Sequence, residues 1–124
     1  MIYGTGIDIV AEARIAEVHA RRGRQLVRRL LHPAEFEAFA QSRKPDNYLA
    51  KAWAAKEAFS KALATGVRGF GLADVGVVRS GSGAPRLIYS RSMQDRLTEL
   101  GILHGHVSLT DDAGMVCAFV VLER

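Results

Sequence analysis

Residues 49–63 read LAKAWAAKEAFSKAL, which is rich in alanine and contains neither glycine nor proline. This composition predicts a helix. Pro45 and Asp46 mark its start, with Asp46 as a candidate N-cap, and the helix is expected to run to about Ala64 and to be ended by Gly66. Helical spacing brings small residues and two charges to one side, namely Ala50, Ala54, Glu57, Lys61 and Ala64. Alanine carries little bulk, so this side lets another element or a ligand come close.

Residues 2–10, IYGTGIDIV, predict a strand with an unusual face. Alternation places on one face Ile2, Gly4, Gly6, Asp8 and Val10. Glycine weakens a strand unless something must approach it closely. We expect that something to be a ligand beside Asp8.

Asp8 and Glu57 are both acids at positions where the apolar pattern predicts burial. Buried carboxylates usually need a shared cation, and two of them side by side repel unless a cation lies between. Two hard oxygen ligands with Lys61 nearby suit a magnesium ion that holds a phosphate ester. The alternative for Glu57 and Lys61 is an ordinary exposed salt bridge between helix positions i and i+4.

The other predicted elements give an α+β fold. The helices are 12–31 with a break at Gly23, 33–41 opened by Pro33, and 90–100 closed by Gly101, and the strands are 74–80, 86–89, 106–110 and 115–123. Residues 81–85 predict a hairpin loop and 111–114 a tight turn. We expect one domain over residues 1–124, with a mostly antiparallel sheet packed by the long helix.

Basic residues are concentrated in the segment 11–32. It holds six arginines against two glutamates, and therefore carries the whole net charge of +4. The arginines are Arg14, Arg21, Arg22, Arg24, Arg28 and Arg29. A basic helical patch on an otherwise balanced chain suggests an acidic partner, and a solvated helix face without a partner is the alternative. The chain has no zinc-finger or RNA-binding signature, so we expect no nucleic acid.

The composition indicates the cellular compartment in which we expect the protein. The only cysteine, Cys117, excludes an internal disulfide and favours a reducing compartment. No stretch reaches the roughly 18 apolar residues of a membrane span. The N-terminal residues lack the pattern of a secretion signal. We therefore expect a cytoplasmic protein without a membrane anchor.

Two further segments carry polar residues in a pattern. In the strand 106–110, His106, Ser108 and Thr110 point to one side, which indicates either a solvent-exposed sheet face or a contact with phosphate or ribose. The loop that holds Gly66 and Gly69 could cradle an anion through its backbone, although its spacing matches neither a P-loop nor a dinucleotide fingerprint. An ordinary helix-ending loop is the alternative.

Three segments together resemble a known family: GIDIV at 6–10, LAKAWAAKEAFSKAL at 49–63 and HVSLTD at 106–111. They closely resemble the small bacterial holo-acyl-carrier-protein synthases of the 4′-phosphopantetheinyl transferase superfamily, and the resemblance spans essentially the whole chain. It implies an enzyme of lipid metabolism that moves the phosphopantetheine arm of coenzyme A onto a serine of apo-acyl carrier protein. The product released is adenosine 3′,5′-bisphosphate.

The resemblance also implies roles for individual residues. Asp8 and Glu57 match the ligands of Mg²⁺, and Lys61 matches the lysine that neutralises phosphate charge. The positions that match the coenzyme site are Lys61, Gly66, Pro85, His106, Ser108 and Thr110. Those that match the basic first helix, which meets the carrier protein, are Arg14, Arg21 and Arg24. A homotrimer with sites at subunit interfaces is implied as well.

The chain departs from the family pattern at two places. Ala52-Trp53 stands where the family commonly has a basic residue followed by phenylalanine, so a coenzyme phosphate contact is either missing or supplied by Lys51 or Lys56. Ala64 stands where the family commonly has glycine. Our first candidate for the general base of the transfer is Glu57 acting through a metal-bound water, and Asp111 is the second.

Two rival functions fit parts of the pattern. A non-enzymatic basic module would explain the arginines but gives no role to Asp8 and Glu57. A Mg²⁺-dependent phosphoesterase would use the same two carboxylates without a carrier protein.

Overall fold

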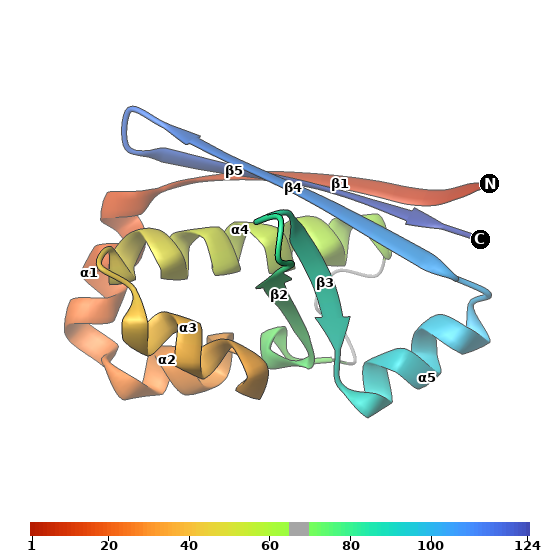
Figure 1. Ribbon diagram of the computed structural model, residues 1–124, viewed down its shortest axis with the longest axis horizontal. Coiled ribbons are helices and arrows are strands. Elements are labelled where there is room, and N and C mark those ends of the chain that lie inside the picture. The colour runs from red at the N-terminus through yellow and green to blue at the C-terminus, as the bar shows by residue number, and fades with distance from the viewer. Residues whose placement is uncertain (65–69) are drawn as a thin grey trace.

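The computed structural model describes residues 1–64 and 70–124, and Gly66 therefore lies outside the described residues. A three-stranded antiparallel sheet lies along one long helix (Figure 1). The sheet has the order β1-β5-β4, with β1 at Ile2–Ala11, β5 at Met115–Glu123 and β4 at His104–Asp112, and the helix is α4, Pro45–Ala62. The predicted α+β class with mostly antiparallel strands is confirmed.

The remaining elements pack around the sides of α4 that the sheet leaves open, and one strand of their hairpin also contacts β4 (Figure 1). They are α1 (Glu12–Arg22), α2 (Arg24–Leu30), η1 (Pro33–Glu35), α3 (Phe36–Gln41), η2 (Leu72–Asp74), the hairpin of β2 (Val75–Arg79) with β3 (Pro85–Tyr89), and α5 (Arg91–Glu99). The predicted break at Gly23 is confirmed, since this glycine separates α1 from α2 with a φ of 49°. No helix in the described ranges is long and apolar enough to cross a membrane.

The core lies between α4 and the inner face of the sheet. On the central strand, Val116, Ala118, Val120 and Leu122 alternate inward and are buried. On α4 the alanines at 50, 54 and 58 are fully buried. Small side chains on the helix let the sheet approach its axis, so β1 and α4 come into close contact.

The glycines of β1 make this close contact possible. A Cβ on Gly4 would lie 2.0 Å from the carbonyl oxygen of Ala62, and a Cβ on Gly6 would lie 1.8 Å from that of Ala58. The prediction of a close approach at these glycines is confirmed. The predicted occupant was wrong, because the backbone of α4 and not a ligand fills the space.

Three element boundaries in the structure differ from those predicted from the sequence. Asp46 was predicted as the N-cap of α4, but Lys44 holds that position and Pro45 is the first helical residue, while the Asp46 carboxylate lies 2.7 Å from His19 Nδ1. The predicted turn 111–114 is too long: β4 continues through Asp112, and only Ala113 and Gly114 turn the chain, both with positive φ. Such a two-residue turn matches the twist of the strands it joins. Residues 33–41 begin as η1 before α3.

Candidate active site

Asp8 and the last turns of α4 form a charged cluster at the β1 edge of the sheet. Asp8 lies on the inner face of β1, opposite the buried Ala118 of β5, and its side chain is 16% exposed. Lys61 donates from Nζ to the carbonyl oxygen of Ile7 at 2.9 Å and to Asp8 Oδ1 at 3.3 Å. The close contacts of Gly4 and Gly6, which precede Ile7, explain the geometry, because they bring β1 within reach of a lysine on α4.

The second oxygen of Asp8 has no hydrogen-bond partner among residues 1–64 and 70–124. Oδ2 is buried and accepts no hydrogen bond from any described residue. A buried carboxylate oxygen without a partner costs free energy, so native structures seldom leave one unless an ion or ligand supplies the missing contact. The oxygen therefore fits a cation.

Glu57 lies close enough to Asp8 to sense its charge. Burial, and then the negative charge of Asp8, raise the pKa of Glu57 above its ordinary value, while Lys61 and Arg14 act in the opposite direction. Both raising effects penalise the ionised carboxylate, and a cation between the two acids would relieve them. Four elements separate the two acids along the chain, and the fold brings the acids together at one place.

This donor set suits Mg²⁺ better than a metal held by protein alone. Within the described ranges, no three side chains of histidine, cysteine, aspartate or glutamate gather to hold a metal. Mg²⁺ commonly takes one or two carboxylates and completes its shell with water and substrate phosphate. Asp8 and Glu57 are the residues that would hold it.

The three polar residues of β4 lie away from this cluster. His106, Ser108 and Thr110 are exposed on the outer face of the sheet, and β5 separates β4 from β1. His106 Nε2 lies 2.6 Å from Glu123 Oε1, and this contact lowers the pKa of Glu123. Within one chain, therefore, these residues do not meet Asp8.

The other predicted site residues occupy different parts of the surface. Pro85 is half-buried at the start of β3, in the smaller sheet. Arg14, Arg21 and Arg24 are exposed on α1 and the start of α2. Arg14 is the one that the charge of Glu57 reaches, so the basic surface begins beside the carboxylate cluster.

A groove of about 640 Å³ lies between α3, α4 and β2. Its basic and aromatic lining residues are Arg43, Lys44, Tyr48, Lys51 and Arg79. Burial, and then the charge of Glu35, raise the pKa of Tyr48 to about 12, so its hydroxyl keeps its proton. Sequence reasoning missed this groove, although the adjacent Arg43-Lys44 just before the long helix was a signal for it.

Lys51 and Lys56 were the two candidates for the missing coenzyme contact, and only Lys51 lines the groove. Lys51 lines the groove and lies 3.5 Å from Asp111 Oδ1. Lys56 is fully buried and bonded to Glu35, so it cannot reach a bound coenzyme. Asp111, the second candidate base, is held by Lys51 and by the Asn47 amide at 3.1 Å.

Residues 4–120 match the family model of the 4′-phosphopantetheinyl transferase superfamily. The chain belongs to this superfamily. A holo-[acyl-carrier-protein] synthase of Neisseria meningitidis is 42% identical over 125 residues, which cover 100% of both chains. The enzyme class predicted from the sequence is confirmed by such relatives: the chain is a transferase of the holo-acyl-carrier-protein synthase type, and phosphopantetheine transfer is its chemistry.

Solved structures of the superfamily share the fold. The crystal structure of the synthase from Neisseria meningitidis aligns with a TM-score of 0.96 at 42% identity over 100% of each chain. The synthase of Helicobacter pylori, solved in complex with coenzyme A, aligns with a TM-score of 0.83 at 30% identity over 96% of this chain and 99% of that one.

Proposed function

We propose that this transferase moves the phosphopantetheine arm of coenzyme A to a serine of apo-acyl carrier protein, with Mg²⁺ held by Asp8 and Glu57. The observation that carries the proposal is the buried Oδ2 of Asp8 beside Glu57 and Lys61, which has no hydrogen-bond partner in the described part of the chain. The relatives named above, one of them solved with coenzyme A, support the substrate and the carrier.

The chain's own residues divide the reaction between them. Bound Mg²⁺ would supply positive charge to the diphosphate of coenzyme A. Lys61, half-exposed, presents its ammonium group to the oxygens that gain charge as the bisphosphate leaves. The serine oxygen forms the new bond to phosphorus, the bond to the bisphosphate breaks, and Glu57 accepts the serine proton.

A second copy of the chain completes the site in this proposal. The outer sheet face exposes apolar side chains that a monomer would usually cover: Ile7 at 59%, Ile9 at 63% and Phe119 at 42%. This face also carries His106, Ser108 and Thr110, which lie away from Asp8 of the same chain. A homotrimer that packs through this face would let these residues reach the coenzyme bound at a neighbouring Asp8.

The groove and the arginines supply the remaining contacts. The groove lined by Arg43, Lys44 and Lys51 has the charge and volume to hold a phosphate-bearing part of coenzyme A. The exposed Arg21 and Arg24 would dock the acidic carrier protein, with Arg14 nearest the carboxylates.

The deciding experiment is the intact mass of apo-acyl carrier protein after incubation with coenzyme A, Mg²⁺ and this chain. A gain of one phosphopantetheine arm per carrier is the expected result. Release of the bisphosphate with an unmodified carrier would instead support a phosphoesterase. Salt-sensitive binding of nucleic acid with no consumption of coenzyme A would support a basic binding module.

A further inference from the structure

Lys56 and Glu35 form an ion pair that is sealed from solvent. Lys56 Nζ lies 2.7 Å from Glu35 Oε1 and also donates to the carbonyl oxygen of Leu30. The two side chains are 0% and 1% exposed. Lys56 directly precedes Glu57 on α4, so the pair begins one residue from the carboxylate cluster.

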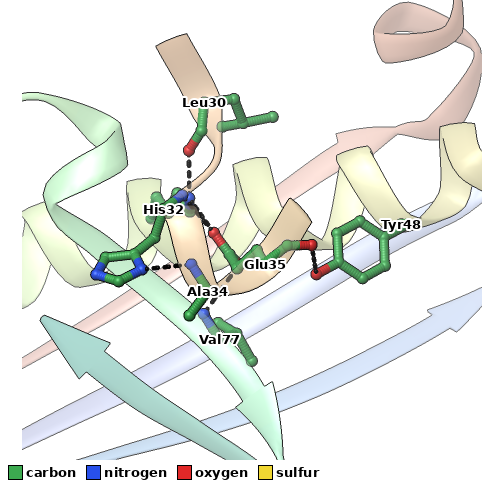
Figure 2. Close-up of polar contacts among 7 residues, drawn as sticks. Leu30, His32, Ala34, Glu35, Tyr48 and Val77 are labelled. Atoms are coloured by element: carbon green, nitrogen blue, oxygen red, sulfur yellow. Dashed lines mark hydrogen bonds and ion pairs between the residues drawn. The ribbon is translucent and has the colours of Figure 1, made fainter. Parts of the chain in front are cut away.

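Glu35 collects hydrogen bonds from several elements (Figure 2). Its Oε1 accepts from the His32 N–H at 2.8 Å, its Oε2 from the Val77 N–H at 3.0 Å, and its carbonyl oxygen from the Tyr48 hydroxyl at 3.3 Å. One buried network therefore ties α4 to the end of α2, to η1 and to β2.

Stability alone is a poor reason for such a pair. Taking two charges out of water costs several kcal/mol, and well-packed apolar residues of similar volume are often as stable or more so. An ion pair adds orientation, because its hydrogen bonds form in only one arrangement of the two side chains. The orientation at issue here is the rotation of α4 about its own axis.

The side of α4 that faces the sheet holds that rotation less firmly, because its contacts with Ile7 and Asp8 come from Lys61, a half-exposed side chain at the last turn. There the helix presents Ala54, Ala58 and Ala62 to the sheet, and these small side chains make contact without interlocking. The glycines of β1 set how close the helix comes. Successive side chains leave a helix about 100° apart, so holding Lys56 also sets where Glu57 points.

We propose that the Lys56–Glu35 pair is a positioning device that turns Glu57 toward Asp8 and so preorganises the cation site. This inference rests on the proposed function. Two adjacent acids repel when no cation is present, and rotation of α4 would separate them. Such a rotation would pull Lys56 out of the network and leave Glu35 buried without its cation, which makes it costly.

The test is cation binding without turnover. Mn²⁺, as a substitute for Mg²⁺, is titrated calorimetrically into the protein with coenzyme A and no carrier protein, against a coenzyme-only blank. Lys56→Met and the nearly isosteric Glu35→Gln are each expected to weaken Mn²⁺ binding by about tenfold or more, as loss of outer contacts to a metal site does. Circular dichroism verifies that each variant is folded.

The matched control is Leu97→Ala, a core truncation on α5, away from α4. It should lower the melting temperature and leave Mn²⁺ affinity within about twofold, since it loses packing only. The proposal is overturned if folded Glu35→Gln and Lys56→Met bind Mn²⁺ like the wild type, or if Leu97→Ala weakens binding as much at an equal loss of melting temperature. A wild-type protein that neither binds Mn²⁺ with coenzyme A nor modifies the carrier would overturn the proposed function itself.

Discussion

Lys61 Nζ lies 3.3 Å from Asp8 Oδ1, although the two residues are 53 positions apart in the sequence. The contact joins the edge strand β1 to the last turn of α4, and it leaves the other oxygen of Asp8 without a partner among the described residues. One half of the carboxylate is thus held by the protein, and the other half is available to a cation.

Asp8→Asn should abolish most of the transfer while leaving the fold intact. The amide is a far weaker ligand for Mg²⁺ than a carboxylate, so we expect kcat/KM to fall on the order of 10²–10³-fold. The lost pair with half-exposed Lys61 contributes little to stability. Urea unfolding in EDTA, beside the carrier mass assay, separates the two effects. Full turnover by Asp8→Asn would rule out its role as a ligand.

Gly6→Ala should disrupt the packing of β1 against α4. The added Cβ would lie 1.8 Å from the carbonyl oxygen of Ala58, which is backbone and cannot rotate away. We expect a loss of about 3 kcal/mol or more in the free energy of unfolding. Gly81→Ala is the matched control, since nothing lies within 4 Å of its Cβ, and it should stay within about 0.5 kcal/mol of the wild type.

Reversal of Arg21 and Arg24 to glutamate should raise the KM for acyl carrier protein at least about tenfold at low salt, and the KM for coenzyme A little. The effect should shrink in 0.5 M salt, because exposed charges are screened over a few ångströms there. Arg91→Glu, an exposed reversal on α5, controls for a charge reversal away from this surface. Arg14 is left out because it lies near Glu57. Equal changes in both KM values would contradict a docking role.

Glu57 should make the metal-free protein less stable at neutral pH than an ordinary glutamate would, and this penalty should disappear at acid pH. Its pKa is raised by folding, so the folded protein binds the proton more tightly than the unfolded chain. The group therefore opposes folding at neutral pH, and this effect is relieved as the pH falls through the raised pKa. In EDTA, Glu57→Gln should stabilise the protein more at pH 7 than at pH 4. Urea unfolding at both values checks the sign.

Phe119→Glu should separate the copies if they pack through the outer sheet face. A charge on this face is easily solvated in a monomer and costly in an apolar interface. Light scattering should report a monomer, and the carrier mass assay should show that transfer is lost. Leu103→Glu, at another exposed apolar side chain just before β4, should behave as the wild type.

Subunit mixing tests whether the site is shared. Asp8→Ala supplies an intact outer face, and His106→Ala supplies an intact carboxylate cluster. If one site takes Asp8 and His106 from different copies, mixed oligomers contain some complete sites, and activity should return on mixing two inactive variants. A mixture that stays inactive would show that each chain builds its own site.

The sequence predicted the carboxylate cluster because Asp8 and Glu57 each contradict the apolar pattern around them. Such contradictions are visible without coordinates. What approaches a glycine is not visible, and for this reason the space at Gly4 and Gly6 was assigned to a ligand although the α4 backbone fills it.

The Lys56–Glu35 network was beyond sequence reasoning for a similar reason. Lys56 was a candidate for a coenzyme contact, since a lysine on a helix is usually exposed. Its burial depends on where η1 and β2 pack, which is a matter of tertiary structure. The groove likewise joins residues of α3, α4 and β2 that no local pattern connects.

The main chain of β1 lies against the main chain of α4, so backbone atoms set the distance between the two elements. Substitutions elsewhere in the hydrophobic core can change the stability of the protein without changing the distance between β1 and α4. An engineer seeking a more heat-resistant variant can therefore rebuild the rest of the interior, provided that positions 4 and 6 stay glycine and the sheet-facing positions of α4 stay small.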